Sequence, residues 1–395
     1  MRFLHTSDWH IGKPLRNQRR DDEYVAALAE VLDIGKREQV DCLLVAGDVF
    51  DSVAPPPESE RIVFDFFREL IGARIPAVVI AGNHDHPRRM NAVSRVLDLM
   101  DVHVRGEPVT AEEGGVIEIA SPDGVETAVI AALPWVSERK VRDFESLFAG
   151  GQHFAEYAEG VSAMLMHLAK CFRPEAVNIL LAHLFLSGAF VAPESGERPL
   201  HIGNLYAVNP QMIPSNAQYA ALGHVHNPDQ PAAFQLANAY YSGSLLQCDF
   251  GEAGQQKGVN IVDVSPGSKA KVEAVTLTSV RQLKNLGSHK QGLTMDEIRS
   301  VASETAAAYL KVFVKAERPV PGLAQEVRDL LPNAIDIVVE DVDRKGEERP
   351  VDIGRQTPVE LFMAYYADLH SGAEPPAELM SLFNHLYEEV TGAAH

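Results

Sequence analysis

Cysteine is scarce in this sequence, which has three in 395 residues: Cys42, Cys171 and Cys248. They are far apart and odd in number, so they make neither a disulfide framework nor a CxxC metal motif. Small disulfide-stabilised secreted proteins are thereby excluded, and free thiols are typical of a reducing compartment. We therefore expect three unpaired thiols and a cytoplasmic protein.

Long apolar runs are absent as well. No segment reaches the roughly 18 uninterrupted apolar residues that a membrane-spanning helix needs. The opening segment, MRFLHTSDWH, brings charged and histidine side chains where a signal peptide would be apolar. We therefore expect neither a membrane span nor a secretory leader.

Basic residues are outnumbered by acidic ones: the sequence has 35 Lys and Arg residues and 55 Asp and Glu residues, which gives a formal net charge of -20. A protein that holds nucleic acid by bulk electrostatics is usually basic, because neutralising phosphates supplies most of the affinity. An acidic chain can still act on DNA if its cations are concentrated locally, or if a partner supplies a positive surface.

The chain is long enough for two or three domains, and its 46% apolar and 23% charged residues indicate a sizeable core. Five short apolar runs end in polar clusters: RFLHTS before Asp8, DCLLVAG before Asp48, AVVIAGN before His84, NILLA before His183 and QYAALG before His224. Such runs are typical of strands buried on both faces. Helical patterns over 22–37 and 58–71 alternate with the early runs, so we expect a layered α/β sheet. Functional groups gather at the carboxyl ends of strands in such sheets.

The sequence changes character near residue 273. Helix-like 294–308, strand-like 309–316, helix-like 322–331 and strand-like 334–342 predict a small α/β unit, with Thr294 and Glu297 in capping-box spacing. A polar stretch then precedes two amphipathic helices, one starting at Thr357-Pro358-Val359-Glu360 and one over 376–391. We predict three domains, at 1–272, 273–343 and 344–395.

The polar clusters contain the ligands of a two-metal site. Two neighbouring divalent metals need about four protein ligands each, one of them shared, and borderline transition metals accept imidazole mixed with carboxylate. Residues i and i+2 of an extended segment point the same way, so Asp8 and His10, or His224 and His226, can face one ion. Glycines at 47, 82 and 223 permit tight turns where the backbone comes close to the metals. The candidate ligands are Asp8, His10, Asp48, Asn83, His183, His224 and His226.

The fragments DxH, GD, GNHD, H and GHxH, in this order over residues 1 to about 230, resemble the signature of the calcineurin-like metallophosphoesterases. HTSDWHIGK, GDVFD, GNHDHP, YSGS (241–244) and DFGE (249–252) are similar to the SbcD family of bacterial nuclease subunits. The resemblance implies a layered β-sandwich flanked by helices, with a small α/β capping domain and C-terminal helices.

The resemblance also implies roles for individual residues. One metal would be bound by Asp8, His10 and His226, the other by Asn83, His183 and His224, with Asp48 bridging both. Two Mn²⁺ ions are the implied cofactor, although ligand softness alone would allow iron or zinc. His84 would stabilise the transition state or protonate the leaving oxygen. Asp51 or Asp85 could orient it, and the sequence does not choose between them.

Interactions with DNA and proteins are expected at three further places. Lys13, Arg16, Arg19 and Arg20 after the first metal loop, and Arg88 and Arg89 after the third, could form a local phosphate track, or a solvated surface. The apolar stretches 62–71 and 92–100 are either core or a homodimer contact, which the family favours. The C-terminal helices either cap the small domain or, as in the family, bind the coiled coil of an SbcC-type ATPase.

The expected function is that of a Mn-dependent DNA nuclease subunit. It would act as 3′→5′ double-strand exonuclease and single-strand or hairpin endonuclease in DNA repair, recombination and replication. No GxxxxGK[ST] loop occurs in the sequence, so ATP hydrolysis would belong to the SbcC-type partner. The alternative is a metallophosphodiesterase that acts on nucleotides or another small phosphodiester. The extra domain and tail favour the nuclease, because a small-molecule esterase needs neither.

Overall fold

The structure is a computed structural model of the chain. It describes residues 1–137, 139–142, 157–192, 206–289, 291–302, 305, 307–316, 322–341, 358–369, 375–376 and 379–383. The chain divides into two compact units, Met1–Asp341 and Val342–His395.

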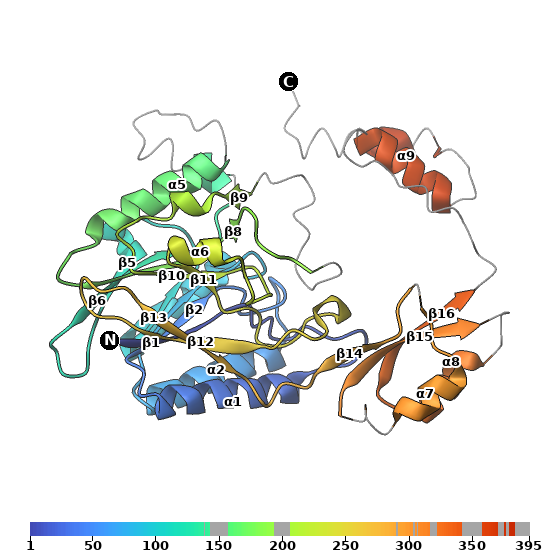
Figure 1. Ribbon diagram of the computed structural model, residues 1–395. Helices are drawn as coiled ribbons and strands as arrows, with labels where there is room; N and C mark the ends of the chain where they lie inside the picture. The colour runs from blue at the N-terminus through green and yellow to red at the C-terminus, as the bar shows by residue number, and fades with distance from the viewer. Residues whose placement is uncertain are drawn as a thin grey trace. The chain divides into compact units, whose positions relative to one another are not determined.

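Two β-sheets form the centre of the first unit (Figure 1). The six-stranded sheet has the order β13-β12-β1-β2-β3-β4, and the five-stranded sheet has the order β11-β10-β7-β6-β5. Neighbours among β1 to β4, and among β6, β7, β10 and β11, are parallel, whereas β12, β13 and β5 pair antiparallel. The strands are β1 (Arg2–Thr6), β2 (Cys42–Ala46), β3 (Ala77–Ile80), β4 (Val102–Arg105), β5 (Val116–Ala120), β6 (Thr127–Leu133), β7 (Val177–His183), β10 (Tyr219–Gly223), β11 (Ala239–Tyr241), β12 (Gly258–Asp263) and β13 (Lys271–Thr276).

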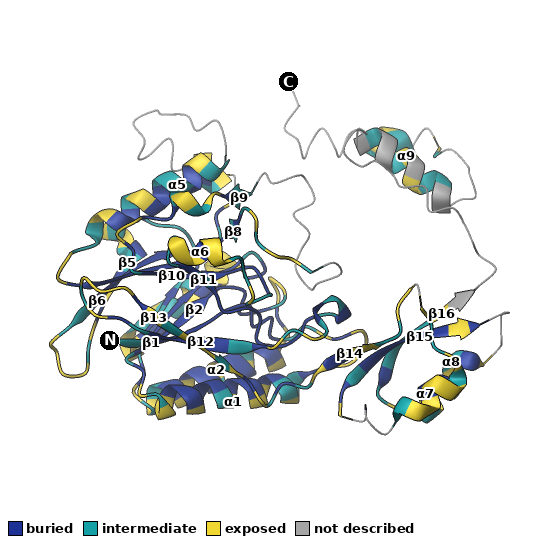
Figure 2. Ribbon diagram, viewed as in Figure 1, coloured by how far each residue is buried: buried dark blue, intermediate teal, exposed yellow. Residues whose placement is uncertain are grey.

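Side chains alternate between two layers along each central strand, as the pleat requires. In β2, Cys42 and Leu44 belong to the core between the two sheets, whereas Leu43 and Val45 pack toward the helices. In β7, Ile179 faces the same inter-sheet core and Leu180 faces the opposite way. Both faces are buried, which explains why these strands are continuous apolar runs in the sequence (Figure 2).

Helices cover the outer faces of the two sheets. Helix α1 (Asp21–Arg37) and α2 (Pro57–Gly72) lie along the six-stranded sheet, and α5 (Tyr157–Leu168) lies along the five-stranded sheet (Figure 1). Helix α1 begins with three acidic residues and ends with two basic ones, which complements its dipole. The shorter elements are α3 (Pro87–Leu97), η1 (Asp98–Met100), η2 (Ala111–Gly115), η3 (Ala169–Cys171), β8 (Phe185–Leu186), β9 (Ala207–Val208), η4 (Pro210–Met212), α6 (Ala232–Leu236) and η5 (Phe250–Glu252).

A third, parallel sheet of order β14-β15-β16 has its own apolar core with α7 and α8. Its elements are β14 (Leu283–Leu286), α7 (Met295–Val301), β15 (Tyr309–Ala316), α8 (Leu323–Leu330) and β16 (Ala334–Asp341). The predicted capping box of Thr294 and Glu297 is present. Helix α7 is shorter than predicted: it ends at Val301, and part of 302–308 lies outside the described residues.

This small sheet rests on the larger body through a separate apolar cluster. Phe250 of η5 packs with Leu15 and with Leu283 of β14. The side-chain oxygen of Gln247 also accepts a hydrogen bond of 2.6 Å from the backbone N–H of Leu283. The loop before η5 and the first strand of the small sheet are therefore joined by both apolar and polar contacts.

The second unit contains α9 (Pro358–Leu369), in which Phe362 stacks on Phe383 with ring centroids 4.3 Å apart. The predicted capping residue Thr357 and most of the predicted helix over 376–391 lie outside the described residues. In the described ranges no helix is both long and apolar enough to cross a membrane.

The predicted fold class is confirmed: a β-sandwich flanked by helices, with a small α/β unit and a C-terminal helix. The domain boundaries stay a prediction. The boundary after residue 272 falls inside β13, which pairs along its length with β12, so a division after Thr276 would keep that strand whole.

The apolar stretch 62–71 is mostly core, because Ile62, Val63, Phe66, Phe67 and Leu70 are buried. The stretch 92–100 differs. Leu99 is 85% exposed and Val96 60% exposed, and Met100 and Phe64 of α2 are also exposed. Core packing therefore accounts for most of the first stretch and for Val93 and Leu97 of the second, but not for these four exposed side chains.

A buried histidine in the inter-sheet layer leads to a prediction about pH. The ring of His5 lies 2.8 Å from the hydroxyl of Tyr219, and burial lowers the pKa of His5 to about 3. Below about pH 6.5 the His5 side chain is protonated in the unfolded chain but stays neutral in the folded chain. The free energy of unfolding therefore decreases as the pH falls. From about pH 7 to pH 5, we expect the wild type to lose about 2 kcal/mol more free energy of unfolding than His5→Gln. Urea unfolding of both proteins in EDTA measures this difference, and equal losses would contradict it.

Candidate metal centre

The predicted ligands come together where the carboxyl ends of the two sheets meet. Asp8, Asp48 and Asn83 follow β1, β2 and β3 of the six-stranded sheet, while His183 ends β7 and His224 follows β10 of the other. All seven candidate ligands are buried or half-buried. The expectation that the polar clusters form one site is met by their positions, and their role as ligands stays a prediction.

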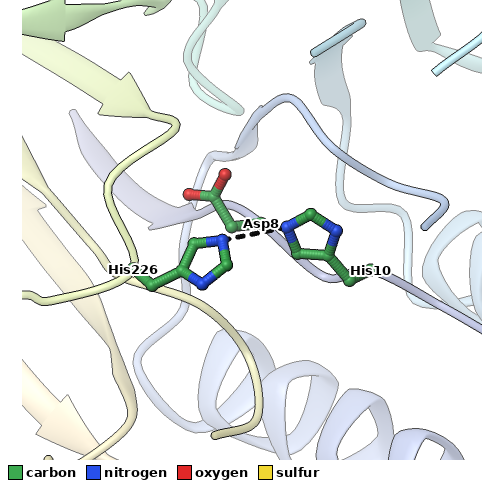
Figure 3. A group of neighbouring side chains, drawn as sticks. All are labelled: Asp8, His10 and His226. Carbon is green, nitrogen blue, oxygen red and sulfur yellow. Dashed lines mark hydrogen bonds between the residues drawn. The ribbon is translucent and has the colours of Figure 1, made fainter. Parts of the chain in front are cut away.

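One group consists of Asp8, His10 and His226, whose candidate ligand atoms lie within 4.8 Å of one another (Figure 3). The Nε2 atoms of the two imidazoles face each other at 3.0 Å. The Asp8 carboxylate accepts a hydrogen bond from the hydroxyl of Ser7 at 2.6 Å and from the backbone N–H of His224 at 2.9 Å. Two ring nitrogens and a carboxylate therefore converge on one point.

A second group consists of Asn83, His183 and His224. The side-chain oxygen of Asn83 lies 3.0 Å from Nε2 of His183 and 2.9 Å from Nδ1 of His224. The other ring nitrogen of His183, Nδ1, lies 2.8 Å from the carbonyl oxygen of Ala46. Because a carbonyl can only accept, Nδ1 carries the proton, and Nε2 presents its lone pair to the group.

Asp48 lies between the two groups. Its Oδ2 atom is 3.7 Å from Nε2 of His10 and 3.6 Å from Nε2 of His183, one residue of each group. Its Oδ1 atom accepts a hydrogen bond of 2.8 Å from the backbone N–H of His84, which holds the carboxylate in this position. This is the placement that a bridging ligand requires.

The backbone at the site is strained. Asp8, His10 and Asp48 have φ angles of 51°, 48° and 50°, and His224 has a φ of 100°. Residues other than glycine rarely adopt positive φ, and such strain gathers at functional sites. The backbone N–H of Asp8 binds the carbonyl of Gly47, and that of His10 binds the carbonyl of Asp48, so the first two loops hold each other in this form.

Three glycines allow the loops to approach one another. A Cβ atom on Gly82 would lie 2.1 Å from Oδ1 of Asp48, and one on Gly223 would lie 1.9 Å from the carbonyl oxygen of Ala46. A Cβ atom on Gly47, at φ +90°, would lie 2.3 Å from Nδ1 of His183. The close backbone approach predicted at these glycines is therefore present, and Gly47 also has the positive φ that favours glycine.

The electrostatics of the site suit a cation. Burial, together with repulsion from Asp8 and Asp85, raises the pKa of Asp48 well above its usual value. Burial lowers the pKa of His10 and His224, and that of His183 to about 3, so these imidazoles are neutral near neutral pH. Neutral imidazole is the form that binds metal, and a cation would offset the repulsion between the carboxylates. Divalent metals fit both groups.

His226 has a different environment. Its Nδ1 lies 2.8 Å from Oε1 of Glu252, whose other oxygen lies 2.8 Å from the ammonium of Lys257. Burial alone would lower the pKa of His226, but the Glu252 carboxylate raises it well above the usual value. No role for Glu252 or Lys257 was predicted from the sequence. The only available signal was the DFGE run, which carried the resemblance but no function.

His84 is buried beside the first group, with its ring 4.7 Å from that of His10, edge to face. Its Nδ1 lies 2.8 Å from the carbonyl oxygen of Asp51 and 3.9 Å from the carboxylate of that residue. The Asp51 carboxylate lies 3.0 Å from the ammonium of Lys13, whereas Asp85 accepts hydrogen bonds from the backbone N–H groups of Val49, Phe50 and Gly82. Between the two residues proposed to orient His84, the close contact is with the main chain of Asp51.

The predicted phosphate track is largely engaged in ion pairs. Five of its six cations contact acidic residues: Lys13 with Asp51, Arg16 with Asp249 and Asp336, Arg19 with Asp21, Arg20 with Glu23, and Arg89 with Glu60. Arg20 is also buried, and its guanidinium donates to the carbonyl of Gln247. Arg88, in the first turn of α3, is exposed. The structure thus brings the ligands together, but it does not gather these cations as free charges.

Trp135, for which no role was predicted, stacks on the ring of His224 with centroids 5.3 Å apart and planes 19° apart. Its backbone N–H binds the carbonyl of Ala81, so the indole is fixed to the loop that carries Asn83. An isolated tryptophan after a strand provides no signal of such a contact.

Comparison with known proteins places this site in a family. Residues 1–228 match the calcineurin-like phosphoesterase family. The chain is 33% identical to the SbcD subunit of the SbcCD nuclease of Bacillus subtilis, over 99% of this chain and 98% of that protein. It is 30% identical to the corresponding SbcCD nuclease subunit of Rhodobacter capsulatus, over 93% and 94%. Among solved structures, TT1561 of Thermus thermophilus is 15% identical, with a TM-score of 0.38 over 70% of this chain and 98% of that one.

The close approach at Gly82 leads to a prediction about metal binding. In Gly82→Ala the new methyl group has to displace the Asp48 carboxylate, so we expect the affinity for Mn²⁺ to fall about tenfold or more. Gly72→Ala is the matched control, because no atom of the described residues lies within 4 Å of its new Cβ. Isothermal titration with Mn²⁺ measures both variants. Wild-type affinity in Gly82→Ala would show that Asp48 does not contribute to binding.

Proposed function

This chain belongs to the calcineurin-like phosphoesterases and, within them, to the SbcD proteins, and from that premise we propose that it is a Mn²⁺-dependent DNA nuclease subunit. As a member of this family it is a metal-dependent hydrolase of phosphoester bonds. We propose 3′→5′ exonuclease activity on duplex DNA and endonuclease activity on single strands and hairpins, serving DNA repair, recombination and replication.

The observation that carries the proposal is the extent of the similarity. It runs over almost the full length of both this chain and the B. subtilis protein, so it includes the small sheet and the C-terminal region as well as the phosphoesterase domain. A phosphoesterase of small molecules would need only the first part. The local geometry supports the proposal too, because the two candidate ligand groups share Asp48.

We assign Asp8, His10 and His226 to one Mn²⁺ and Asn83, His183 and His224 to the other, with Asp48 bridging them. When bound, such a pair of ions activates water and offsets negative charge on the phosphate oxygens. Asn83 is neutral, which lowers the anionic charge of its group and favours acceptance of a phosphate. The buried imidazoles of this group stay neutral and need no proton loss before they bind.

We assign to His84 the protonation of the leaving 3′ oxygen or the stabilisation of charge in the transition state. Its Nδ1 donates to the carbonyl of Asp51, which fixes the ring and leaves Nε2 to act on the substrate. The Asp85 carboxylate supports the same loop through three backbone hydrogen bonds. We therefore assign Asp51 to orienting the ring and Asp85 to holding the loop.

We propose Arg88 as the first DNA contact among the cations near the site. It is exposed at the start of the helix that follows the loop carrying Asn83 and His84. Lys13, Arg16, Arg19, Arg20 and Arg89 are each paired with an acidic residue, which weakens their attraction for phosphate. With a net charge of -20, much of the positive surface for DNA would come from a partner.

We propose two protein contacts. The exposed apolar side chains Val96, Leu99, Met100 and Phe64 support a homodimer through α2, α3 and η1. The C-terminal region, residues 344–395, would bind a cytoplasmic SbcC-type ATPase through its helices, with Phe362 and Phe383 stacked within the region itself. The small α/β unit that contains β14, β15 and β16 would be the capping domain.

His84→Gln provides the test of the proposed reaction. The purified chain should shorten 5′-labelled linear duplex and cut a hairpin in Mn²⁺, and should do neither in EDTA. At equal protein concentration the variant should lose cleavage by about a hundredfold or more, because the general acid is missing while both ligand groups are intact. Anomalous diffraction from Mn²⁺-soaked crystals of the variant should show two ions.

Each contrary result identifies the failing part of the proposal. An empty metal position in His84→Gln would make this residue a ligand rather than an acid. Hydrolysis of mononucleotides or small diesters, with duplex and hairpin untouched even after addition of an SbcC-type ATPase, would replace the nuclease with a small-molecule phosphodiesterase.

A further inference from the structure

A buried ion pair holds His226, one of the candidate ligands. Glu252 and Lys257 are 0% and 1% exposed, and their carboxylate and ammonium lie 2.8 Å apart. Oε1 of Glu252 lies 2.8 Å from Nδ1 of His226, and Nζ of Lys257 lies 2.9 Å from the carbonyl oxygen of His226. Glu252 therefore contacts the ring of His226, and Lys257 contacts its main-chain carbonyl.

The remaining contacts fix the pair itself. Oε2 of Glu252 accepts hydrogen bonds from the backbone N–H of Cys248 at 3.0 Å and the hydroxyl of Ser244 at 3.3 Å. Lys257 also donates to the side-chain oxygen of Gln255 at 2.8 Å. Burying a charged pair is costly unless further hydrogen bonds satisfy both partners, and here they do. Both charged groups are therefore satisfied, and both contact His226.

The contact with Glu252 determines which nitrogen of His226 is available. An ionised carboxylate can only accept, so Nδ1 of His226 carries a proton and donates it to Glu252. Nε2 is then the nitrogen that can bind a metal, which displaces any proton there, and this atom faces Nε2 of His10 beside Asp8 (Figure 3). A carboxylate behind an imidazole also makes the opposite nitrogen a better donor to a metal.

The second group lacks such support in the described residues. The atom behind His183 is the neutral carbonyl oxygen of Ala46, and the oxygen donor beside His183 and His224 is the neutral amide of Asn83. The first group has the carboxylate of Asp8 in place of that amide. The two groups therefore differ in charge both among the ligands and behind them.

We propose that Glu252, held by Lys257, is a positioning residue that fixes His226 for metal binding and makes the Asp8–His10–His226 site the tighter of the two. This inference rests on the two-metal site of the proposed function. It assigns a role to the DFGE segment, whose last residue is Glu252.

The test removes both charges together, because Glu252→Gln alone would leave the ammonium of Lys257 buried without its carboxylate. In the double variant Glu252→Gln, Lys257→Gln, we expect one of the two Mn²⁺ dissociation constants to rise about 10- to 100-fold and the other to stay unchanged. The matched control is Glu118→Gln, Arg173→Gln, which removes an exposed ion pair from the edge of the five-stranded sheet. The control should keep both wild-type constants in isothermal titration.

A second measurement uses the wild type and does not depend on whether the double variant folds. Crystals of the metal-free protein given one molar equivalent of Mn²⁺ should show the anomalous peak between Asp8, His10 and His226. A peak between Asn83, His183 and His224 would overturn the inference.

The outcomes separate this inference from the proposed function. If the wild type binds no Mn²⁺ at either group, the proposed two-metal function fails. If the wild type binds two ions and the folded double variant binds both with wild-type affinity, only the role of Glu252 fails.

Discussion

The two sheets approach so closely at their carboxyl ends that the positions at Gly47 and Gly223 have no room for a side chain. A Cβ atom on Gly223 of β10 would overlap the carbonyl oxygen of Ala46 in β2, and one on Gly47 after β2 would overlap the ring of His183 in β7. Loops from both sheets can therefore place their ligands within a few ångströms of one another. The strained backbone of Asp8, Asp48 and His224 is part of the same constraint, since a relaxed loop would carry these side chains apart.

Much of this arrangement could be predicted from the sequence because its causes are local. A strand buried on both faces is a continuous apolar run, and the polar residues that end it must lie at one edge of a parallel sheet. That logic located the strands before Asp8, Asp48 and His183. Their place in a two-metal ligand set came from residue types and spacing, and their assignment to each ion came from the family resemblance. Both stay predictions until ions are observed.

What the sequence did not reveal depends on contacts between distant segments. Glu252 lies 26 residues from the histidine it holds, and nothing in its neighbourhood marks it as buried. Trp135 follows β6 and reaches His224, which follows β10, across the end of β7 in the same sheet. In the cation cluster after Asp8 the same reason applies to Arg16, whose partners Asp249 and Asp336 come from remote parts of the chain, whereas Arg19 and Arg20 pair with the nearby Asp21 and Glu23. Pairing with distant acids cannot be read from composition.

The turn η5 contacts both the small sheet and the candidate metal ligand His226. Phe250, at its start, packs against Leu15 and Leu283 beneath the small sheet, while Glu252, at its end, holds His226. The small sheet is therefore not a detachable module. A chain truncated before β14 would expose Phe250 and loosen the turn whose last residue supports a metal ligand, so an isolated phosphoesterase fragment is a poor substitute for the full chain in any study of its chemistry.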